Sequence, residues 1–242
     1  MISDAMKPYG LSLLSYYEGD RDAVLILRRD DGYESTIPVK HFFRKESEFG
    51  PIESNAVRQC QGSVLDIGSG TGIHSIVLES QGFTVTAIDI TSEAVDIMRR
   101  CGFRNGLHGD IFEYHGGPFD TLIMLGHGIG IAGDIDGLRK FLVHAKSIIQ
   151  PDGQLLLDSL DVTRSKEPAD LAYHSQNRKE GRYVGEIRMQ FEFQGIAGPF
   201  CRWLHVDHDT LEKYAKEAGW KCETLIKNDY GEYLARLNSA VQ

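Results

Sequence analysis

The sequence predicts an α/β fold in which a doubly wound, mostly parallel sheet ends in an antiparallel C-terminal strand. Residues 63–82 are typical of a strand, a glycine turn and a helix in succession. Two further strand-length apolar runs, at 84–90 and 119–125, are each followed by a helical pattern. Strands that alternate with helices in this way favour a parallel sheet covered on both faces.

The stretch from Ser63 to Gly82 has the features of a nucleotide-type site. Its strand ends at Ile67, and three glycines follow at positions 68, 70 and 72. Glycine lets the backbone adopt positive φ and lets a ligand approach without a Cβ in the way. The helix that begins behind the glycines presents N–H groups and the positive end of its dipole.

The turn differs from the fingerprint of dinucleotide-binding proteins. That fingerprint is G-x-G-x-x-G, whereas this turn is G-x-G-x-G, with Ile73 where the third glycine would fall. Asp66 just before the turn is unfavourable beside a pyrophosphate and suits a ligand with an ammonium group. Asp89, at the end of the next strand, has the spacing of an acid that accepts hydrogen bonds from ribose hydroxyls.

Four motifs in this order resemble those of class I S-adenosylmethionine-dependent methyltransferases. They are D-I-G-S-G-T-G at 66–72, A-I-D-I at 87–90, G-D-I at 109–111 and F-D-T-L-I-M-L at 119–125. The resemblance extends from about residue 52 to residue 159 and includes a C-terminal hairpin. It implies a Rossmann-like fold, S-adenosyl-L-methionine as the cofactor, and methyl transfer as the activity.

The same resemblance implies which residues bind the cofactor. In such proteins an acid and its neighbour at the third motif flank the adenine. The expected cofactor-binding residues are Asp66, Gly68, Ser69, Gly70, Thr71, Gly72, Asp89, Ile90, Asp110, Ile111, Leu125 and Gly126.

His127 is the candidate general base. It follows the third strand within a glycine-rich loop, and the ordinary pKa of histidine suits proton transfer near neutrality. The alternative interpretation is a loop histidine that holds backbone carbonyls. Methyltransferases that modify exocyclic nitrogens of nucleic-acid bases carry an acidic or Asn residue, two prolines and an aromatic at this point, and this loop lacks them. It also lacks the proline–cysteine pair of RNA cytosine-C5 methyltransferases. Neither activity is therefore expected.

Two other functions compete with catalysis by methyl transfer. A partner subunit could bind S-adenosylmethionine without chemistry of its own, and it would need no acceptor pocket. A nicotinamide-dependent oxidoreductase is disfavoured by the missing third glycine and by Asp66.

The composition of the chain limits the kinds of molecule that it is expected to bind. The chain has 242 residues and a formal charge of −9, which disfavours nucleic acid as the acceptor and favours a small molecule. No apolar run reaches the roughly 20 residues of a membrane helix, and the N-terminus lacks a signal-peptide pattern. Four scattered cysteines favour reduced thiols and a cytoplasmic location. The nine histidines do not cluster at ligand spacing, so no metal site is expected.

Residues 1–50 are expected to form an N-terminal hairpin, and proteins of the resembled family commonly use such a segment as a lid over the cofactor. Residues 23–29 are strand-like, Asp30-Asp31-Gly32 is a hairpin turn signal, and residues 33–39 alternate again. Pro38 favours an edge position for the second strand.

Residues 51–242 are expected to form the methyltransferase domain. Pro51 opens a short helix, Asp134 caps a helix whose apolar stripe runs to Ile149, and Pro151-Asp152-Gly153 ends that helix before a strand at 154–158. Residues 160–182 are expected to be a loop or an irregular helix.

The C-terminal part is expected to contribute two hairpins and a helix. Residues 185–193 and 200–206 predict an antiparallel hairpin inserted near 183–206, which helps to shape the acceptor pocket. A helix at 211–218 is closed by Gly219, and strands at 221–227 and 231–237 complete the sheet.

Overall fold

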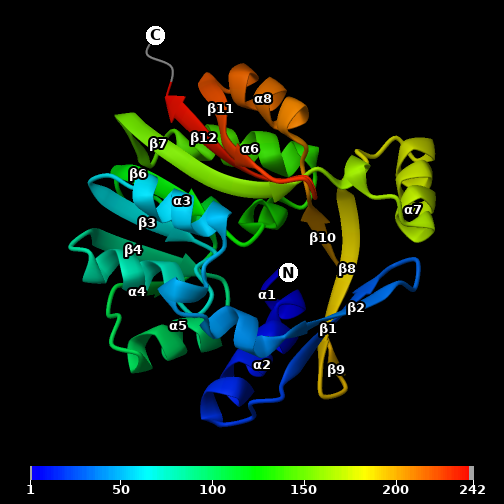
Figure 1. Cartoon of the computed structure of the whole chain (residues 1–242), viewed down its shortest axis with the longest axis horizontal. Coiled ribbons are helices and arrows are strands. Elements are labelled where there is room, and N and C mark those ends of the chain that lie inside the picture. Colours follow the sequence, from blue (N-terminus) through cyan, green and yellow to red (C-terminus); the bar gives the residue numbers. More distant parts are fainter. Residues whose placement is uncertain (1, 240–242) are drawn as a thin grey trace. The chain divides into compact units, whose positions relative to one another are not determined.

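The computed structural model describes residues 2–239 and confirms the predicted α/β architecture (Figure 1). Its larger sheet has seven strands, in the order β11 (Trp220–Lys227), β12 (Glu232–Ser239), β7 (Ile149–Leu160), β6 (Phe119–Met124), β3 (Ser63–Ile67), β4 (Thr84–Asp89) and β5 (Gly106–His108). β4 pairs with β5 and β6 with β7 in parallel, whereas β12 is antiparallel to both β7 and β11. The antiparallel C-terminal pair is the one that the sequence predicts.

A second sheet has the strand order β10 (Cys201–Leu204), β8 (Glu186–Phe193), β1 (Val24–Arg29) and β2 (Glu34–Pro38), and β9 (Ile196–Ala197) pairs with β8. β2 ends the order, as Pro38 predicted. The sequence did not reveal that β8 pairs with β1, for example Leu27 with Phe191. The N-terminal hairpin and the inserted hairpin therefore belong to one sheet.

The chain divides into two compact units, each assembled from separate segments. The first comprises the chain up to Gly50, Leu65–Tyr114 and Arg188–Cys201. The second comprises Pro51–Val64, His115–Ile187 and the chain from Arg202 onward.

The helices and 3-10 turns of the first unit are α1 (Ile2–Ala5), α2 (Lys7–Glu18), η1 (Val39–Phe43), η2 (Glu46–Glu48), α4 (Ile73–Ser80), α5 (Ser92–Arg100) and η3 (Ile111–Glu113). The sequence analysis missed α2, because small or polar residues such as Gly10 and Ser12 occupy much of its buried face. α2 packs on α5 (Figure 1), where Lys7 pairs with Glu93. A Cβ on Gly10 would lie 2.6 Å from a Glu93 carboxylate oxygen, so a larger residue there would displace the end of the Glu93 side chain.

The helices and 3-10 turns of the second unit are α3 (Pro51–Gln59), η4 (Gly128–Ala132), α6 (Ile135–Ala145), η5 (Val162–Arg164), α7 (Pro168–Lys179) and α8 (His208–Glu217). α3 covers one side of β7 and β12, while α6 and α8 pack together on the other side (Figure 1). Asp134 caps α6 as predicted, since its carboxylate accepts a hydrogen bond from the Gly137 amide at 2.8 Å.

Two expectations in the second unit were wrong. The helix α6 ends at Ala145, and β7 already begins at Ile149, so Pro151-Asp152-Gly153 lies within the strand and does not end the helix. A register shift between β6 and β7 explains how the strand accommodates these residues. Phe119 is opposite Ile149, but Thr121 is opposite Gln154, so β7 has extra residues that form a bulge.

Residues 168–179 form the regular helix α7 rather than a loop or an irregular helix. Pro168 occupies its first turn, where a missing N–H costs nothing. Its buried positions are Tyr173, His174 and Asn177, which carry too little apolar character to reveal a helix by periodicity. The Asn177 side-chain amide donates to the carbonyls of Val184 and Glu186 and thereby ties α7 to the start of β8.

Within the described residues, no helix has the length and apolar character that crossing a membrane requires.

Candidate active site

The glycine loop of the first unit joins β3 to α4 as predicted. Gly68 adopts a φ of +68°, and a Cβ added there would meet nothing within 4 Å. Gly72, with a φ of +79°, would place a Cβ 2.7 Å from Cγ of Met98. Gly68 therefore leaves open space of the kind a ligand can approach, whereas Gly72 permits the helix packing behind it.

The amides of this loop are largely used within the chain. Those of Gly68 and Ser69 donate to the Ile88 carbonyl at 2.9 and 3.2 Å, and that of Gly72 donates to the Ser69 carbonyl at 2.9 Å. The Gly70 amide donates to a carboxylate oxygen of Asp89 at 2.8 Å. These bonds hold the loop against the end of β4, and they leave these four amides unavailable as donors to a ligand.

The two predicted strand-end carboxylates are both buried. Asp89 accepts hydrogen bonds from the Gly70 amide and from the amide and hydroxyl of Thr91, at 2.7 to 2.8 Å. Asp66 accepts one from the Ser75 hydroxyl at 2.6 Å. Burial raises the pKa of both carboxyl groups, even though these hydrogen bonds lower it. The exposed fraction is 1% for Asp66 and 6% for Asp89, so both carboxylates belong to the interior of the fold.

Three further predicted cofactor residues lie in the same unit. Asp110 caps η3, where its carboxylate accepts from the Phe112 amide at 2.9 Å, and Ile111 beside it is buried. The carbonyl of Ile90 lies 3.1 Å from a ring nitrogen of His108. The observed role of Asp110 is that of a turn residue, and its contact with adenine stays a prediction. Thr71 lies in the loop itself, where its hydroxyl donates to the Phe42 carbonyl.

The remaining predicted residues belong to the second unit. Leu125 is buried at the end of β6, and Gly126 follows with a φ of +69° and open space at its Cβ position. His127 has a φ of +60°, and within residues 2–239 only Gln194 shares a positive φ among non-glycine residues. Left-handed backbone in a residue other than glycine concentrates at functional sites.

Two carboxylates face the imidazole of His127. Its Nε2 lies 3.9 Å from an oxygen of Asp158 and 3.7 Å from an oxygen of Glu232. The His127 amide donates to the other Asp158 oxygen at 3.0 Å, which fixes the loop to β7. The imidazole of His127 thus lies beside two acids from two neighbouring strands. We call His127, Asp158 and Glu232 the His127 cluster.

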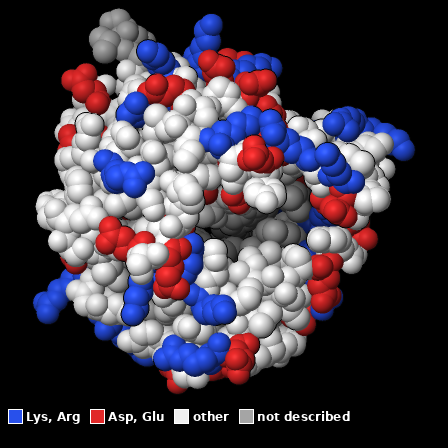
Figure 2. Space-filling model, viewed as in Figure 1, with Lys and Arg blue, Asp and Glu red and all other residues white. Residues whose placement is uncertain are grey.

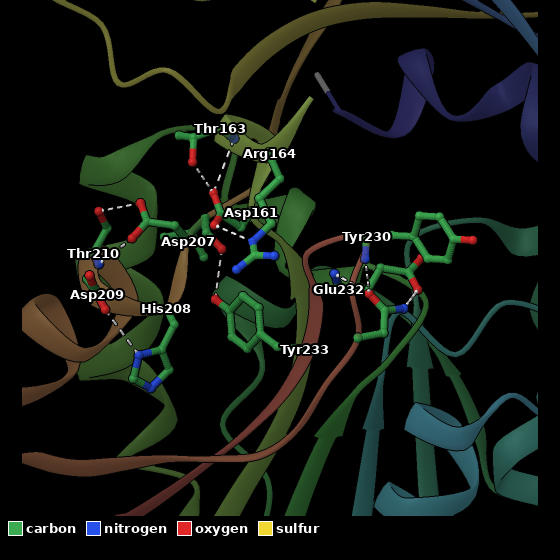
Figure 3. A network of polar contacts seen from close by, with 12 residues as sticks. Asp161, Thr163, Arg164, Asp207, His208, Asp209, Thr210, Tyr230, Glu232 and Tyr233 are labelled. Atoms are coloured by element: carbon green, nitrogen blue, oxygen red, sulfur yellow. Dashed lines mark hydrogen bonds and ion pairs between the residues drawn. The ribbon is translucent and has the colours of Figure 1, made fainter. Parts of the chain in front are cut away.

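The sheet register explains why these residues meet. Met124 on β6 is opposite Leu157 on β7, so Asp158 lies directly beyond that pair. Glu232 begins β12 and is opposite Leu160. Glu232 and Tyr230 are seen together in Figure 3, and Asn228 holds Glu232 by a side-chain bond of 2.7 Å.

A second imidazole adjoins the cluster. The rings of His127 and His205 are 5.3 Å apart and nearly perpendicular. Nδ1 of His205 is buried and has no hydrogen-bond partner among the residues that the structure describes. Burial, with a smaller contribution from His127, lowers the pKa of His205 to about 3, so His205 is neutral at physiological pH and adds no positive charge.

No group of three or more His, Cys, Asp or Glu residues within the described part of the chain is arranged to hold a metal ion.

Comparison with known proteins identifies the family. The methyltransferase domain family matches residues 44–225, which is most of the chain. The chain belongs to this methyltransferase family.

Individual relatives agree with that assignment. A glycine/sarcosine N-methyltransferase of Aphanothece halophytica is 31% identical over 186 residues, covering 70% of this chain and 69% of that enzyme. A ubiquinone biosynthesis O-methyltransferase of Actinobacillus pleuropneumoniae is 29% identical over 115 residues, 41% of this chain and 46% of that enzyme. A SAM-dependent methyltransferase of Bacteroides fragilis, solved with S-adenosyl-L-homocysteine, superposes with a TM-score of 0.85 at 29% identity, over 98% of this chain and 96% of that one.

The chain is therefore an S-adenosylmethionine-dependent methyltransferase, as its motifs indicate. This finding sets aside the nicotinamide-dependent oxidoreductase and the partner subunit without catalysis. The residues present fit the cofactor, because the open space at Gly68 lies in the loop between the buried carboxylates Asp66 and Asp89.

Sequence reasoning missed several residues of these sites. Asp158 had a detectable signal, since it follows an apolar run near the end of its strand, as Asp66 and Asp89 do. Glu232 and His205 had none, because only the pairing of distant strands brings them to His127. Thr91, which donates twice to Asp89, also carries no motif.

We expect His205 to make the folded methyltransferase less stable in acid. Its folded pKa of about 3 lies below the ordinary value of 6.5, so the unfolded chain binds more protons between these values and stability falls as the pH drops below 6.5. Between pH 7 and 5 the loss is at most about 2 kcal/mol, or roughly 4–8 °C in Tm.

Thermal melts of the wild type and His205→Asn at both pH values check this expectation. The variant should lose distinctly less Tm than the wild type between pH 7 and 5. Equal decreases in Tm for the two proteins would show that His205 is protonated in the folded protein as readily as in the unfolded chain. Comparison with the variant cancels the contributions of Asp66 and Asp89, whose raised pKa values act in the opposite direction.

Proposed function

We propose that this methyltransferase transfers its methyl group to the amine nitrogen of a small molecule, with His127 as the general base. The observation that carries this proposal is the His127 cluster, in which Nε2 of one imidazole faces the carboxylates of Asp158 and Glu232.

The charge of the cluster favours a cationic acceptor. Two carboxylates face the imidazole, and the neighbouring His205 remains neutral. Opposite charges within about 4–6 Å stabilise each other, so the cluster attracts a protonated amine. Glu232 is suited to this role because Asn228 fixes one of its oxygens while the other faces His127.

His127 would then take a proton from the acceptor. Bound S-adenosylmethionine supplies an activated methyl group on a sulfonium, which becomes a neutral thioether as the new carbon–nitrogen bond forms. An amine attacks only with a free lone pair, so its proton must leave, and Nε2 of His127 receives it. Asp158 holds the His127 backbone and stabilises the imidazolium that results.

For the cofactor we propose the predicted set: Asp66, Gly68, Ser69, Gly70, Thr71, Gly72, Asp89, Ile90, Asp110, Ile111, Leu125 and Gly126. Asp89 accepts three hydrogen bonds from the chain, and a carboxylate has about four acceptor positions, so a ribose hydroxyl can still bind. Both carboxylates suit the hydroxyl and ammonium groups of the cofactor.

A small acceptor is supported by the relatives and by the charge. One relative is named for glycine and sarcosine, which are small molecules, and another is named for ubiquinone biosynthesis. The formal charge is −9, and acidic and basic side chains are interspersed on the face shown in Figure 2. Nucleic-acid binding needs a basic face, so we propose that nucleic acid is not a partner. As the sequence predicts, we propose no membrane partner either.

A screen of acceptors tests this function. The protein is incubated with isotopically methyl-labelled S-adenosylmethionine and matched sets of small amines and hydroxyl compounds, and labelled products are identified by mass spectrometry. We expect methylated amines. Labelling of hydroxyl compounds alone would contradict the proposal, and calorimetric binding of S-adenosylhomocysteine shows that each preparation is competent.

We also propose that residues 1–50 act as the lid over the cofactor that the sequence predicts. Within the first unit, η1 contacts the glycine loop, because the Thr71 hydroxyl donates to the Phe42 carbonyl. α2 contacts α5 through the ion pair between Lys7 and Glu93. Loss of cofactor affinity on substitution of Tyr9, a residue of α2, supports this role, and unchanged affinity contradicts it.

We further propose a cytoplasmic location, because all four cysteines are free thiols. Recovery of the protein from an oxidising compartment on cell fractionation would contradict it.

A further inference from the structure

Tyr9 of α2 has a hydroxyl that the fold does not use. No hydrogen bond of this hydroxyl is found within residues 2–239, whereas the ring packs edge-on against Phe42 at 5.1 Å between centroids. Tyr9 is half-buried, so its hydroxyl is reachable from outside the fold and is available to donate to a ligand.

The hydroxyl lies beside the cofactor loop. A Cβ on Gly70 would lie 2.9 Å from the Tyr9 hydroxyl oxygen, and among the described residues no other atom outside the adjacent residues lies within 4 Å of that position. Burial, with a smaller contribution from the charge of Asp89, raises the pKa of Tyr9, so its hydroxyl is a protonated donor at physiological pH. Tyr9 therefore presents one O–H group at the loop between the two predicted carboxylates.

Four backbone donors at this point of the loop are already in use. The amides of Gly68, Ser69, Gly70 and Gly72 are already bonded within the chain. The predicted cofactor residues include two buried acids and no lysine or arginine. S-adenosylmethionine carries an amino-acid carboxylate, which needs donors and which the acids repel.

We propose that Tyr9 is a cofactor-binding residue whose hydroxyl donates a hydrogen bond to the amino-acid carboxylate of S-adenosylmethionine. This role lies outside the four sequence motifs and does not depend on the acceptor. It would give the N-terminal segment a direct hydrogen bond to the cofactor. The ion pair between Lys7 and Glu93 holds α2, which carries Tyr9, on α5.

Calorimetric titration of Tyr9→Phe with two ligands tests the proposal. Phenylalanine keeps the ring against Phe42 and removes only the hydroxyl. Loss of a hydrogen bond to a charged group should weaken binding of S-adenosylhomocysteine about 10-fold. Methylthioadenosine shares the nucleoside but lacks the amino-acid carboxylate, and its affinity should change less than about twofold.

The matched control is Tyr16→Phe on the same helix, where the ring lies against Phe43. Its affinity for S-adenosylhomocysteine should equal that of the wild type. Unchanged affinity in Tyr9→Phe, or equal losses for both ligands, would overturn the proposal.

A measurement on the wild type needs no substitution. S-adenosylhomocysteine whose carboxylate is replaced by a carboxamide should bind the wild type clearly more weakly than the parent compound does. In Tyr9→Phe the difference between these two ligands should shrink. Equal binding of both ligands by the wild type would also overturn the proposal.

Discussion

Replacing His127 with asparagine is expected to lower the turnover number about 10²- to 10⁴-fold, the range that general-base catalysis contributes. Asparagine tolerates the left-handed backbone that His127 adopts, with its φ of 60°. It also keeps the amide that donates to Asp158, so the loop remains in place. The variant removes only the proton acceptor.

Steady-state kinetics with an identified acceptor, together with titration of S-adenosylhomocysteine, measure this effect. The affinity for S-adenosylhomocysteine should stay within about threefold of the wild type, and the acidic limb of the pH–rate profile should disappear. His115→Asn is the matched control, because His115 packs against His144 and not against His127. Unchanged turnover in a folded His127→Asn would make His127 a structural residue.

Replacing Asp89 with alanine is expected to weaken binding of S-adenosylhomocysteine about 10- to 100-fold. A charged hydrogen bond is worth roughly 1.5–3 kcal/mol net, and 1.4 kcal/mol corresponds to tenfold. The structure adds a second effect. Asp89 is buried and accepts from two amides and a hydroxyl, so alanine leaves donors unpaired and should cost about 1–3 kcal/mol of stability.

Two variants separate these effects. Asp89→Asn keeps one acceptor oxygen and should lose less affinity and less stability than alanine. Thr91→Val removes a hydroxyl that donates to the same carboxylate at 2.7 Å, and it should change affinity less than about threefold. Titrations and melts of all three variants decide the outcome. Wild-type affinity in Asp89→Ala would place the ribose elsewhere.

The central sheet was predictable because its signals are local. The strands β3, β4 and β6 are apolar runs that alternate with helices, and the glycine loop after β3 carries its own motif. Strong periodicity over short distances survives in any tertiary setting. The predicted cofactor residues from Asp66 to Ile111 accordingly lie in one unit.

The missed features depend on contacts between distant parts of the chain. α2 buries Gly10 and Ser12, which carry no apolar signal, and Gly10 faces Glu93 of α5, a contact that no local pattern encodes. Glu232 reaches His127 through the pairing of β12 with β7, which no local pattern encodes. Ile149 was predicted to lie on a helix, because an apolar residue fits either a helix stripe or a buried strand. In the structure Ile149 pairs with Phe119 on β6, and a bulge follows it in β7.

The pairing of β8 with β1 has a consequence for synthesis on the ribosome. Arg28 on β1 and Glu192 on β8 form an ion pair, although they are 164 residues apart. At roughly 5–20 residues per second, about 8 to 33 s pass between the emergence of these two strands. During this interval β1 exposes an unpaired edge to other nascent chains and to chaperones. β1 therefore lacks this partner strand until the chain has been synthesised as far as Glu192.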